Sequence, residues 1–161
     1  MKKIFYLGIL ALLGLTSCEK DDFCTSSPVT PNLVLRFYDN SDQTKTKNVS
    51  RLSIIAQGKT DSLVINQSLD SIAIPLNSAA TTTVYTLKIN EVDGKVANNQ
   101  ISTLTINYKA QEEYVSRSCG YRYIFNNVTV TAPSGTWIQS LTPTDVNTID
   151  NQSRAHVKIY H

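Results

Sequence analysis

The amino-acid sequence predicts an all-β fold, an antiparallel β-sandwich of immunoglobulin-like or related topology, with a small β-barrel as the alternative. From Leu33 onward, residues alternate with a period of two, and Val, Ile, Thr and Tyr are abundant. Short clusters of Asn, Asp, Gly and Ser interrupt these runs at regular intervals, as the turns of an antiparallel fold require. Apolar residues at helical spacing are nearly absent, which argues against a helical domain.

The first strand is expected at 33–38, where Leu33, Leu35 and Phe37 occupy alternate positions. Residues 39–42, with the sequence DNSD, end this strand in a turn. Gly58 and residues 66–68 are also expected in turns. The remaining strands are expected at 48–56, 62–66, 71–76, 83–90, 101–109, 121–131 and 155–160.

Two later connections carry more specific signals. Residues 92–95, with the sequence VDGK, contain an Asp-Gly pair that is favoured where a hairpin needs positive φ. The polar residues that follow favour a longer loop there. Residues 142–146, which include Pro143, are expected to open a short helical turn, and residues 147–153 are expected to form a loop.

The N-terminus has the features of a bacterial lipoprotein signal. Lys2 and Lys3 precede an apolar run at 4–15, and Leu15-Thr16-Ser17-Cys18 ends it with small residues before a cysteine. The run is shorter than the roughly 20 apolar residues of a membrane span. We therefore expect a signal peptide at 1–17, a tether lipidated on Cys18 at 18–32, and a single β-rich domain at 33–161.

Charge and length limit the classes of function. Removing residues 1–17 from the 161-residue chain leaves 144 residues, which suits one domain. It also removes two of the 15 basic residues, so that 13 remain against 13 acidic ones. A formally neutral domain without a Lys/Arg cluster lacks the electrostatic footprint of a nucleic-acid binder.

Cys24 and Cys119 remain after Cys18 is assigned to lipid, and an exported chain meets an oxidising compartment. We expect them to form a disulfide; the alternatives are two buried thiols or a metal pair, although no histidine lies near either in sequence. A loop of about 95 residues closed in this way is worth about 4–5 kcal/mol in the chain-entropy model.

Three stretches carry a resemblance to a known group of proteins: CEKDDFC from Cys18, PNLVLRFY from Pro31, and SCGY from Ser118. In their order and spacing the chain resembles a family of small Bacteroidetes lipoproteins of unknown function. The resemblance implies an envelope location and the β-rich fold, and it implies no catalytic residues. Lys20-Asp21-Asp22 looks like the acidic export signal of such lipoproteins, which would place the domain on the cell surface; the alternative is a periplasm-facing anchor in the outer membrane.

Catalytic and metal-binding constellations are not recognisable in the sequence. The mature chain has two histidines, and His156 would share the solvated face of the last strand with Lys158 and Tyr160. Glu112-Glu113, the one adjacent carboxylate pair, is expected in a surface turn. We therefore expect no enzymatic activity, no cofactor and no metal site.

A tyrosine- and arginine-rich stretch is the candidate binding surface, because aromatic rings beside guanidinium groups suit contact surfaces. Alternation predicts that Arg122 leaves on the face opposite Tyr121 and Tyr123. Asp61-Ser62 and Asp70-Ser71 also match a weak bacterial O-glycosylation pattern. The residues of the candidate surface are Tyr108, Tyr114, Arg117, Tyr121, Arg122 and Tyr123.

These observations favour a lipid-anchored outer-membrane protein that acts as a non-enzymatic accessory or interaction protein, with another envelope protein as its partner. The alternative is a glycan- or peptide-binding module that uses the tyrosine surface, which a concave aromatic patch would favour. A hydrolase built around His156 is the third hypothesis, and it would need a carboxylate within hydrogen-bond reach of that ring.

Overall fold

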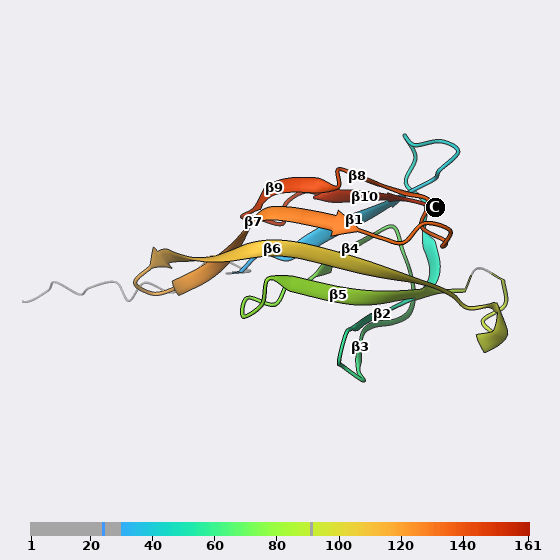
Figure 1. Ribbon diagram of the computed structural model, residues 1–161, viewed down its shortest axis with the longest axis horizontal. Helices are drawn as coiled ribbons and strands as arrows, with labels where there is room; N and C mark the ends of the chain where they lie inside the picture. The colour runs from blue at the N-terminus through green and yellow to red at the C-terminus, as the bar shows by residue number, and fades with distance from the viewer. Residues whose placement is uncertain (1–23, 25–29, 91) are drawn as a thin grey trace, which may run out of the picture.

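The computed structural model describes Cys24, residues 30–90 and residues 92–161 (Figure 1). The expected signal peptide, the lipidation residue Cys18 and most of the expected tether lie outside the described residues. Among the residues that are described, no helix is long and apolar enough to cross a membrane.

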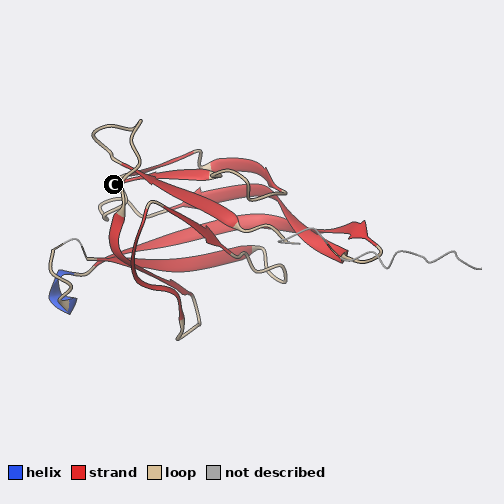
Figure 2. Cartoon of the chain, turned by 180° about the vertical axis from the view of Figure 1, so that it is seen from behind, coloured by secondary structure: helices blue, strands red, loops and turns tan. Residues whose placement is uncertain are grey.

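Two β-sheets pack together, which confirms the predicted sandwich and not the barrel. The smaller sheet has the order β4 (Ser71–Ile74), β1 (Leu33–Tyr38), β10 (Val157–Tyr160) and β8 (Ser140–Thr142). The larger sheet has the order β3 (Ser62–Leu69), β2 (Val49–Ala56), β5 (Thr82–Ile89), β6 (Gln100–Ser116), β7 (Gly120–Thr131) and β9 (Asp145–Ile149). The helix η1 (Val96–Asn98) is a single 3-10 turn, drawn in blue in Figure 2.

The core lies between the two sheets and consists of the alternate side chains that face inward. In β1 these are Leu33, Leu35 and Phe37, all fully buried, as the sequence pattern predicts. β1 pairs in parallel with β10, so the first and last strands of the domain lie side by side. The larger sheet contributes Leu52, Ile54, Leu87, Ile89, Leu104, Ile106, Phe125, Val128, Val130 and Ile149.

Three expectations about elements are wrong. Residues 145–149 form strand β9 instead of a helical turn and loop, because Val128 and Phe125 of β7 pair with this segment along an otherwise open edge. Residues 66–68, expected in a turn, lie inside β3. β6 continues to Ser116, well past the expected end at residue 109, because β7 pairs with it as far as Gly120.

The last strand also differs from expectation. Tyr160 was expected on a solvated face but is buried, and its ring lies 5.8 Å from that of Tyr38 on the neighbouring strand β1. Lys158 places its Nζ 5.2 Å from the centre of the same Tyr38 ring. A cation and two aromatic rings therefore cover this part of the smaller sheet.

The β6–β7 hairpin sets the long axis of the molecule. β6 has 17 residues, and at about 3.4 Å per residue it extends for about 55 Å. One end of β6 follows the loop that contains η1, and the other end leads into the turn at 117–119 (Figures 1 and 2). The loop with η1 and the hairpin turn therefore lie at opposite ends of the molecule.

Candidate functional site

The predicted tyrosine surface lies on the β6–β7 hairpin, and the structure divides its members between the core and the exposed tip. The inward-facing side of β6 carries both Tyr108 and Tyr114, because these residues are separated by an even number of positions. Tyr108 is buried, with its ring 5.1 Å from that of Phe125. Its hydroxyl donates to the Asn77 carbonyl at 2.8 Å. Its inclusion in a binding surface is therefore wrong, because the opposite sheet covers this part of the hairpin.

Tyr114 and Tyr121 form an exposed pair near the hairpin turn. They are cross-strand partners, and their rings meet edge to face at 5.3 Å between centroids. Their exposed fractions are 58% and 63%, although they lie on the same side of the hairpin as the core residues. The hairpin thus extends its apolar face beyond the part that the smaller sheet covers.

The opposite face of the hairpin is polar, and hydrogen bonds of Arg122 connect it to neighbouring residues. Arg122 Nε donates to Glu113 Oε2 at 2.6 Å across the two strands, and Arg122 Nη1 donates to the Asp150 carbonyl at 3.1 Å. The prediction that Arg122 and Tyr121 leave on opposite faces is consistent with this pairing. The expectation that Glu112-Glu113 forms a surface turn is wrong, because both residues lie inside β6.

The other two members of the predicted surface lie near the hairpin turn. Arg117 lies in the turn itself and is exposed. Tyr123 is half-buried against the core, and its backbone N–H donates to Thr30 Oγ1 at 3.1 Å. β9 pairs with β7 only as far as Phe125. The Thr30 hydroxyl therefore accepts the backbone N–H of Tyr123, which lies beyond the reach of β9 on this edge of the sheet.

A disulfide joins the hairpin turn to the segment before β1. Cys24 and Cys119 have an S–S distance of 2.04 Å and a Cα–Cα distance of 4.7 Å, which confirms the predicted pairing. Cys119 lies one residue before β7, and its N–H donates to Ser116 Oγ at 3.0 Å. Cys24 and Thr30 therefore fix the chain to the hairpin at two separate points.

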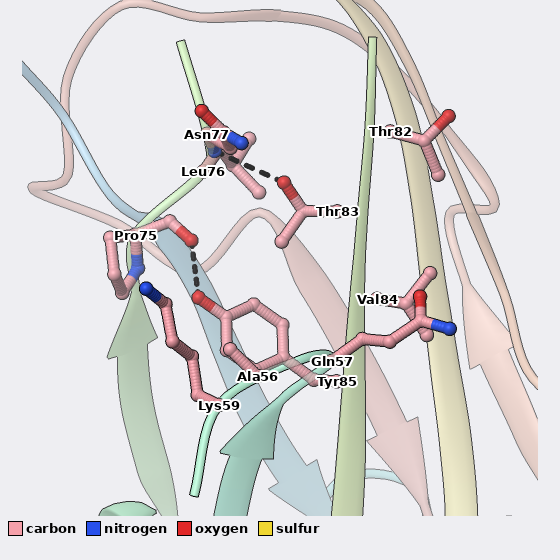
Figure 3. Close-up of a pocket in the computed structure, with 10 residues that line it drawn as sticks. All are labelled: Ala56, Gln57, Lys59, Pro75, Leu76, Asn77, Thr82, Thr83, Val84 and Tyr85. Carbon is pink, nitrogen blue, oxygen red and sulfur yellow. Dashed lines mark hydrogen bonds between the residues drawn. The ribbon is translucent and has the colours of Figure 1, made fainter. Parts of the chain in front are cut away.

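A cleft of about 420 Å³ opens between β2, β5 and the segment after β4 (Figure 3). Tyr85 donates from its hydroxyl to the Pro75 carbonyl at 2.6 Å, and the Asn77 N–H donates to Thr83 Oγ1 at 3.0 Å. Burial, with a smaller contribution from Tyr108, raises the pKa of Tyr85 to about 12. Lys59 is the one charged residue in the lining. These hydroxyl groups serve to hold the segment after β4 in place.

Two further clefts have volumes of about 550 and 360 Å³, and Tyr114 and Tyr121 line neither of these nor the first cleft. The exposed tyrosine pair lies near the projecting end of the β6–β7 hairpin, outside these three clefts (Figure 1). In the part of the chain that is described, no group of three or more His, Cys, Asp or Glu side chains could hold a metal ion.

His156 joins the first and last strands. The ring Nδ1 of His156 accepts the Val34 N–H at 2.9 Å, and the backbone N–H of His156 donates to the Val34 carbonyl at 2.8 Å. Burial lowers the pKa of the ring, and the Asn151 carbonyl and Asp150 charge oppose this in part. An imidazole that accepts at Nδ1 must be unprotonated there, so the geometry agrees with the lowered pKa.

The loop at 92–98, which we call the valine loop, is a surface that the sequence pattern does not single out. Val92 is 68% exposed and Val96 is 83% exposed, and Ile101 lies just beyond them at 56%. The adjacent Asn90 is buried, and its Oδ1 accepts the N–H groups of Val92, Asp93 and Gly94 at 3.0–3.2 Å. The expectation of a longer loop here is confirmed, and Gly94 has the positive φ that the Asp-Gly pair predicts.

Further hydrogen bonds fix the second half of the valine loop and the residues that flank the loop. Asn90 Nδ2 donates to the Lys95 carbonyl at 2.8 Å and to Asn99 Oδ1 at 3.0 Å. Arg51 Nη1 donates to the Asn90 carbonyl at 3.1 Å. Asp93 Oδ1 accepts from Asn98 Nδ2 at 3.0 Å, and this bond is the main cause of a lowered Asp93 pKa. The two exposed valines are therefore presented on an ordered loop.

A family model matches residues 51–161, and its description is a family of unknown function, DUF6452. The chain belongs to this family. The matched region begins within β2 and includes the valine loop, the hairpin and Cys119. Neither the curated proteins nor the solved structures contain a match to the chain. DUF6452 is a family of unknown function, so membership gives this chain a family and no assigned activity.

Proposed function

We propose that this DUF6452 protein is a lipoprotein of the outer membrane, anchored through acyl chains on Cys18, and that its β-sandwich is a non-enzymatic module that binds another envelope protein through the valine loop. The observation that carries the proposal is the valine loop itself, which combines exposed aliphatic side chains with a backbone fixed by one buried side chain. The N-terminal lipoprotein signal supports the anchor.

Pre-organisation is the physical reason to assign binding to the valine loop. A flexible loop loses conformational entropy when it binds, and a loop that is already ordered avoids much of that cost. Asn90 supplies this order through five hydrogen bonds. Val92 and Val96 are then available as small aliphatic anchors, which suit an apolar depression on a protein partner.

Position along the long axis supports a protein partner in place of lipid for this loop. On the proposed anchor, Cys24 and the hairpin turn lie close to the membrane, since Cys24 follows Cys18 by six residues. The valine loop lies at the other end of β6, about 55 Å from the hairpin turn at the rise of an extended strand. This separation from the proposed anchor supports a protein partner for the valine loop.

The test is photocrosslinking in native membranes with the full-length protein. A photoreactive phenylalanine analogue replaces Val96, and a matched control carries it at Ile65, which is 69% exposed on strand β3. We expect a discrete adduct with one envelope protein at Val96 and not at Ile65. Co-isolation of that protein should fall with V92S/V96S and stay unchanged with L63S/I65S. The same adducts at both positions, or none at Val96, would refute the proposed binding surface.

The anchor is tested separately. Mass spectrometry of the N-terminal peptide is expected to find acyl chains on Cys18, and a Cys18→Ala variant is expected to lose them together with its place in the membrane fraction. An unmodified Cys18 in the membrane-bound protein would exclude the lipoprotein proposal, whatever the crosslinking result.

A further inference from the structure

The tip of the β6–β7 hairpin carries a second exposed apolar surface, the pair Tyr114 and Tyr121, which we call the tyrosine tip. We propose that the tyrosine tip rests in the headgroup region of the membrane that holds the acyl chains. This inference rests on the proposed anchor and adds to it a second, non-covalent contact between the protein and lipid. It also assigns an orientation to the domain.

The length of chain between the anchor and the tip is the first argument. Cys24 follows Cys18 by six residues, which span at most about 21 Å when fully extended. The disulfide places Cys24 with a Cα–Cα distance of 4.7 Å from Cys119. Cys119 lies in the turn that connects the strands of Tyr114 and Tyr121. A cysteine acylated at residue 18 therefore keeps the tyrosine tip within a short distance of the bilayer surface.

The chemistry of the exposed residues is the second argument. Tyrosine has an apolar ring and a polar hydroxyl, and it is enriched at the level of lipid headgroups for that reason. The two rings are neighbours on one face, and the next cross-strand pair on that face, farther from the tip, is Glu112 with Tyr123. The carboxylate of Glu112 thus lies on the side of the rings away from the turn, where it stays in water when the tip meets lipid.

The opposite face of the hairpin is suited to remain in water. The guanidinium of Arg122 is paired with Glu113 and also bonded to the Asp150 carbonyl, so this face joins the arm to the sandwich. The hairpin therefore has one aromatic face and one charge-paired face, and it is supported at its base. Such an arm can hold two rings at a fixed depth.

Depth-dependent quenching tests this orientation. The lipidated full-length protein is reconstituted in vesicles of phosphatidylethanolamine and phosphatidylglycerol that contain brominated acyl chains, which quench tryptophan on contact. Tyr121→Trp is the first reporter and Tyr114→Trp is the second. The matched control is Ile65→Trp, because Ile65 has an exposed fraction of 69%, close to the 63% of Tyr121.

The control lies far from the tip along the sheet. Val64 pairs with Ile54, Ile54 with Leu87, and Leu87 with Ser102 near the start of β6. Ser102 and Tyr114 are 12 residues apart on the same strand, which corresponds to about 40 Å. The native Trp137 is buried and is present in all three variants, so its emission is a shared background.

We expect quenching of the added tryptophan at position 121 or 114 to be roughly threefold or more that at position 65, as interfacial burial of an aromatic side chain requires. Equal quenching at all three positions, in protein that floats with the vesicles and is acylated on Cys18, would overturn the tyrosine-tip proposal and leave the anchor intact. Protein without acyl chains on Cys18 would overturn both. A tip that is unquenched in vesicles but shielded from acrylamide in native membranes would assign it to a protein contact, and would also overturn the proposal.

Discussion

Replacing Asn90 with alanine is expected to destabilise the protein by about 2–4 kcal/mol, because this side chain organises the valine loop. Its Oδ1 accepts three backbone N–H groups, from Val92, Asp93 and Gly94. Its Nδ2 donates to the Lys95 carbonyl and to Asn99 Oδ1. Asn90 is 3% exposed, so water cannot take over these contacts while the loop keeps its shape.

The magnitude follows from the number of contacts and from their exposure after the change. A neutral hydrogen bond contributes about 0.5–1.5 kcal/mol net, so five bonds set an upper range of about 2.5–7.5 kcal/mol. The residues of the loop itself are exposed, and their N–H groups can bind water once the loop relaxes. Because of this relaxation, the expected loss in the free energy of unfolding for Asn90→Ala is about 2–4 kcal/mol. Asn98→Ala removes one bond, Nδ2 to Asp93 Oδ1 at the surface, and should cost less than about 1 kcal/mol.

Urea denaturation, followed by the fluorescence of Trp137, measures the free energy of unfolding, and amide hydrogen exchange at residues 92–94 measures local order. In Asn90→Ala we expect both the midpoint and the local protection to fall, whereas Asn98→Ala should leave the midpoint nearly unchanged. A loss of stability below about 1 kcal/mol, with unchanged exchange at residues 92–94, would refute the claim that Asn90 orders the loop. It would also remove the main support for binding by the valine loop.

Three further perturbations test other parts of the structure. Cys24→Ser with Cys119→Ser opens a crosslink between residues 95 positions apart, and should lower the free energy of unfolding by about 4 kcal/mol in urea denaturation; a loss below about 1 kcal/mol would contradict the entropic account. His156 has a lowered native pKa, so its stabilising contribution is present above the unfolded pKa of about 6.5 and is lost as pH falls through the native pKa. The pH dependence of unfolding should therefore decrease in His156→Gln, and an unchanged slope would show that other groups cause it. Tyr108→Phe should cost about 1 kcal/mol because it removes the hydrogen bond from the buried Tyr108 side chain to the Asn77 carbonyl, whereas Tyr121→Phe should stay within about 0.5 kcal/mol; equal losses by thermal denaturation would contradict the division between core and tip.

Alternation in the sequence is a reliable guide where both the strand and its covering layer are complete. Leu33, Leu35 and Phe37 alternate with more accessible residues, and β1 begins and ends where the pattern predicts. The disulfide could also be predicted from the sequence, because the expected export signal and the two cysteines that remain after Cys18 favour a pair. In both cases the signal is contained in the residues themselves.

Strand β9 could not be predicted in the same way. Its residues 145–149 include three polar positions, and β7 supplies the hydrogen bonds that make them a strand. An edge strand of this kind depends on its neighbour more than on its own propensity. Asn90 presents a similar difficulty, since a buried asparagine that orders a loop has the same sequence signature as an asparagine in an ordinary turn.

The tyrosine surface shows where alternation stops being informative. Tyr108 and Tyr114 lie on the same face of β6, and the pattern treats them as equivalent. One is 5% exposed and the other 58% exposed, because the smaller sheet covers the hairpin only part of the way. Periodicity indicates which side chains share a face, but the length of the covering sheet decides which of them reach solvent.

The disulfide connects these findings to the proposed orientation through the length of the tether. Without it, the nearest hairpin contact among the described residues is that of Thr30, 12 residues after Cys18, and a segment of this length reaches about 42 Å. With it, Cys24 is covalently joined to the hairpin turn only six residues after Cys18, and the reach falls to about 21 Å. The shorter tether keeps the hairpin turn nearer the anchor than the longer one would, whereas the far end of β6 lies about 55 Å from that turn. On the proposed anchor, reduction of the disulfide should therefore weaken the tyrosine-tip contact with lipid while leaving the valine loop and its partner surface intact.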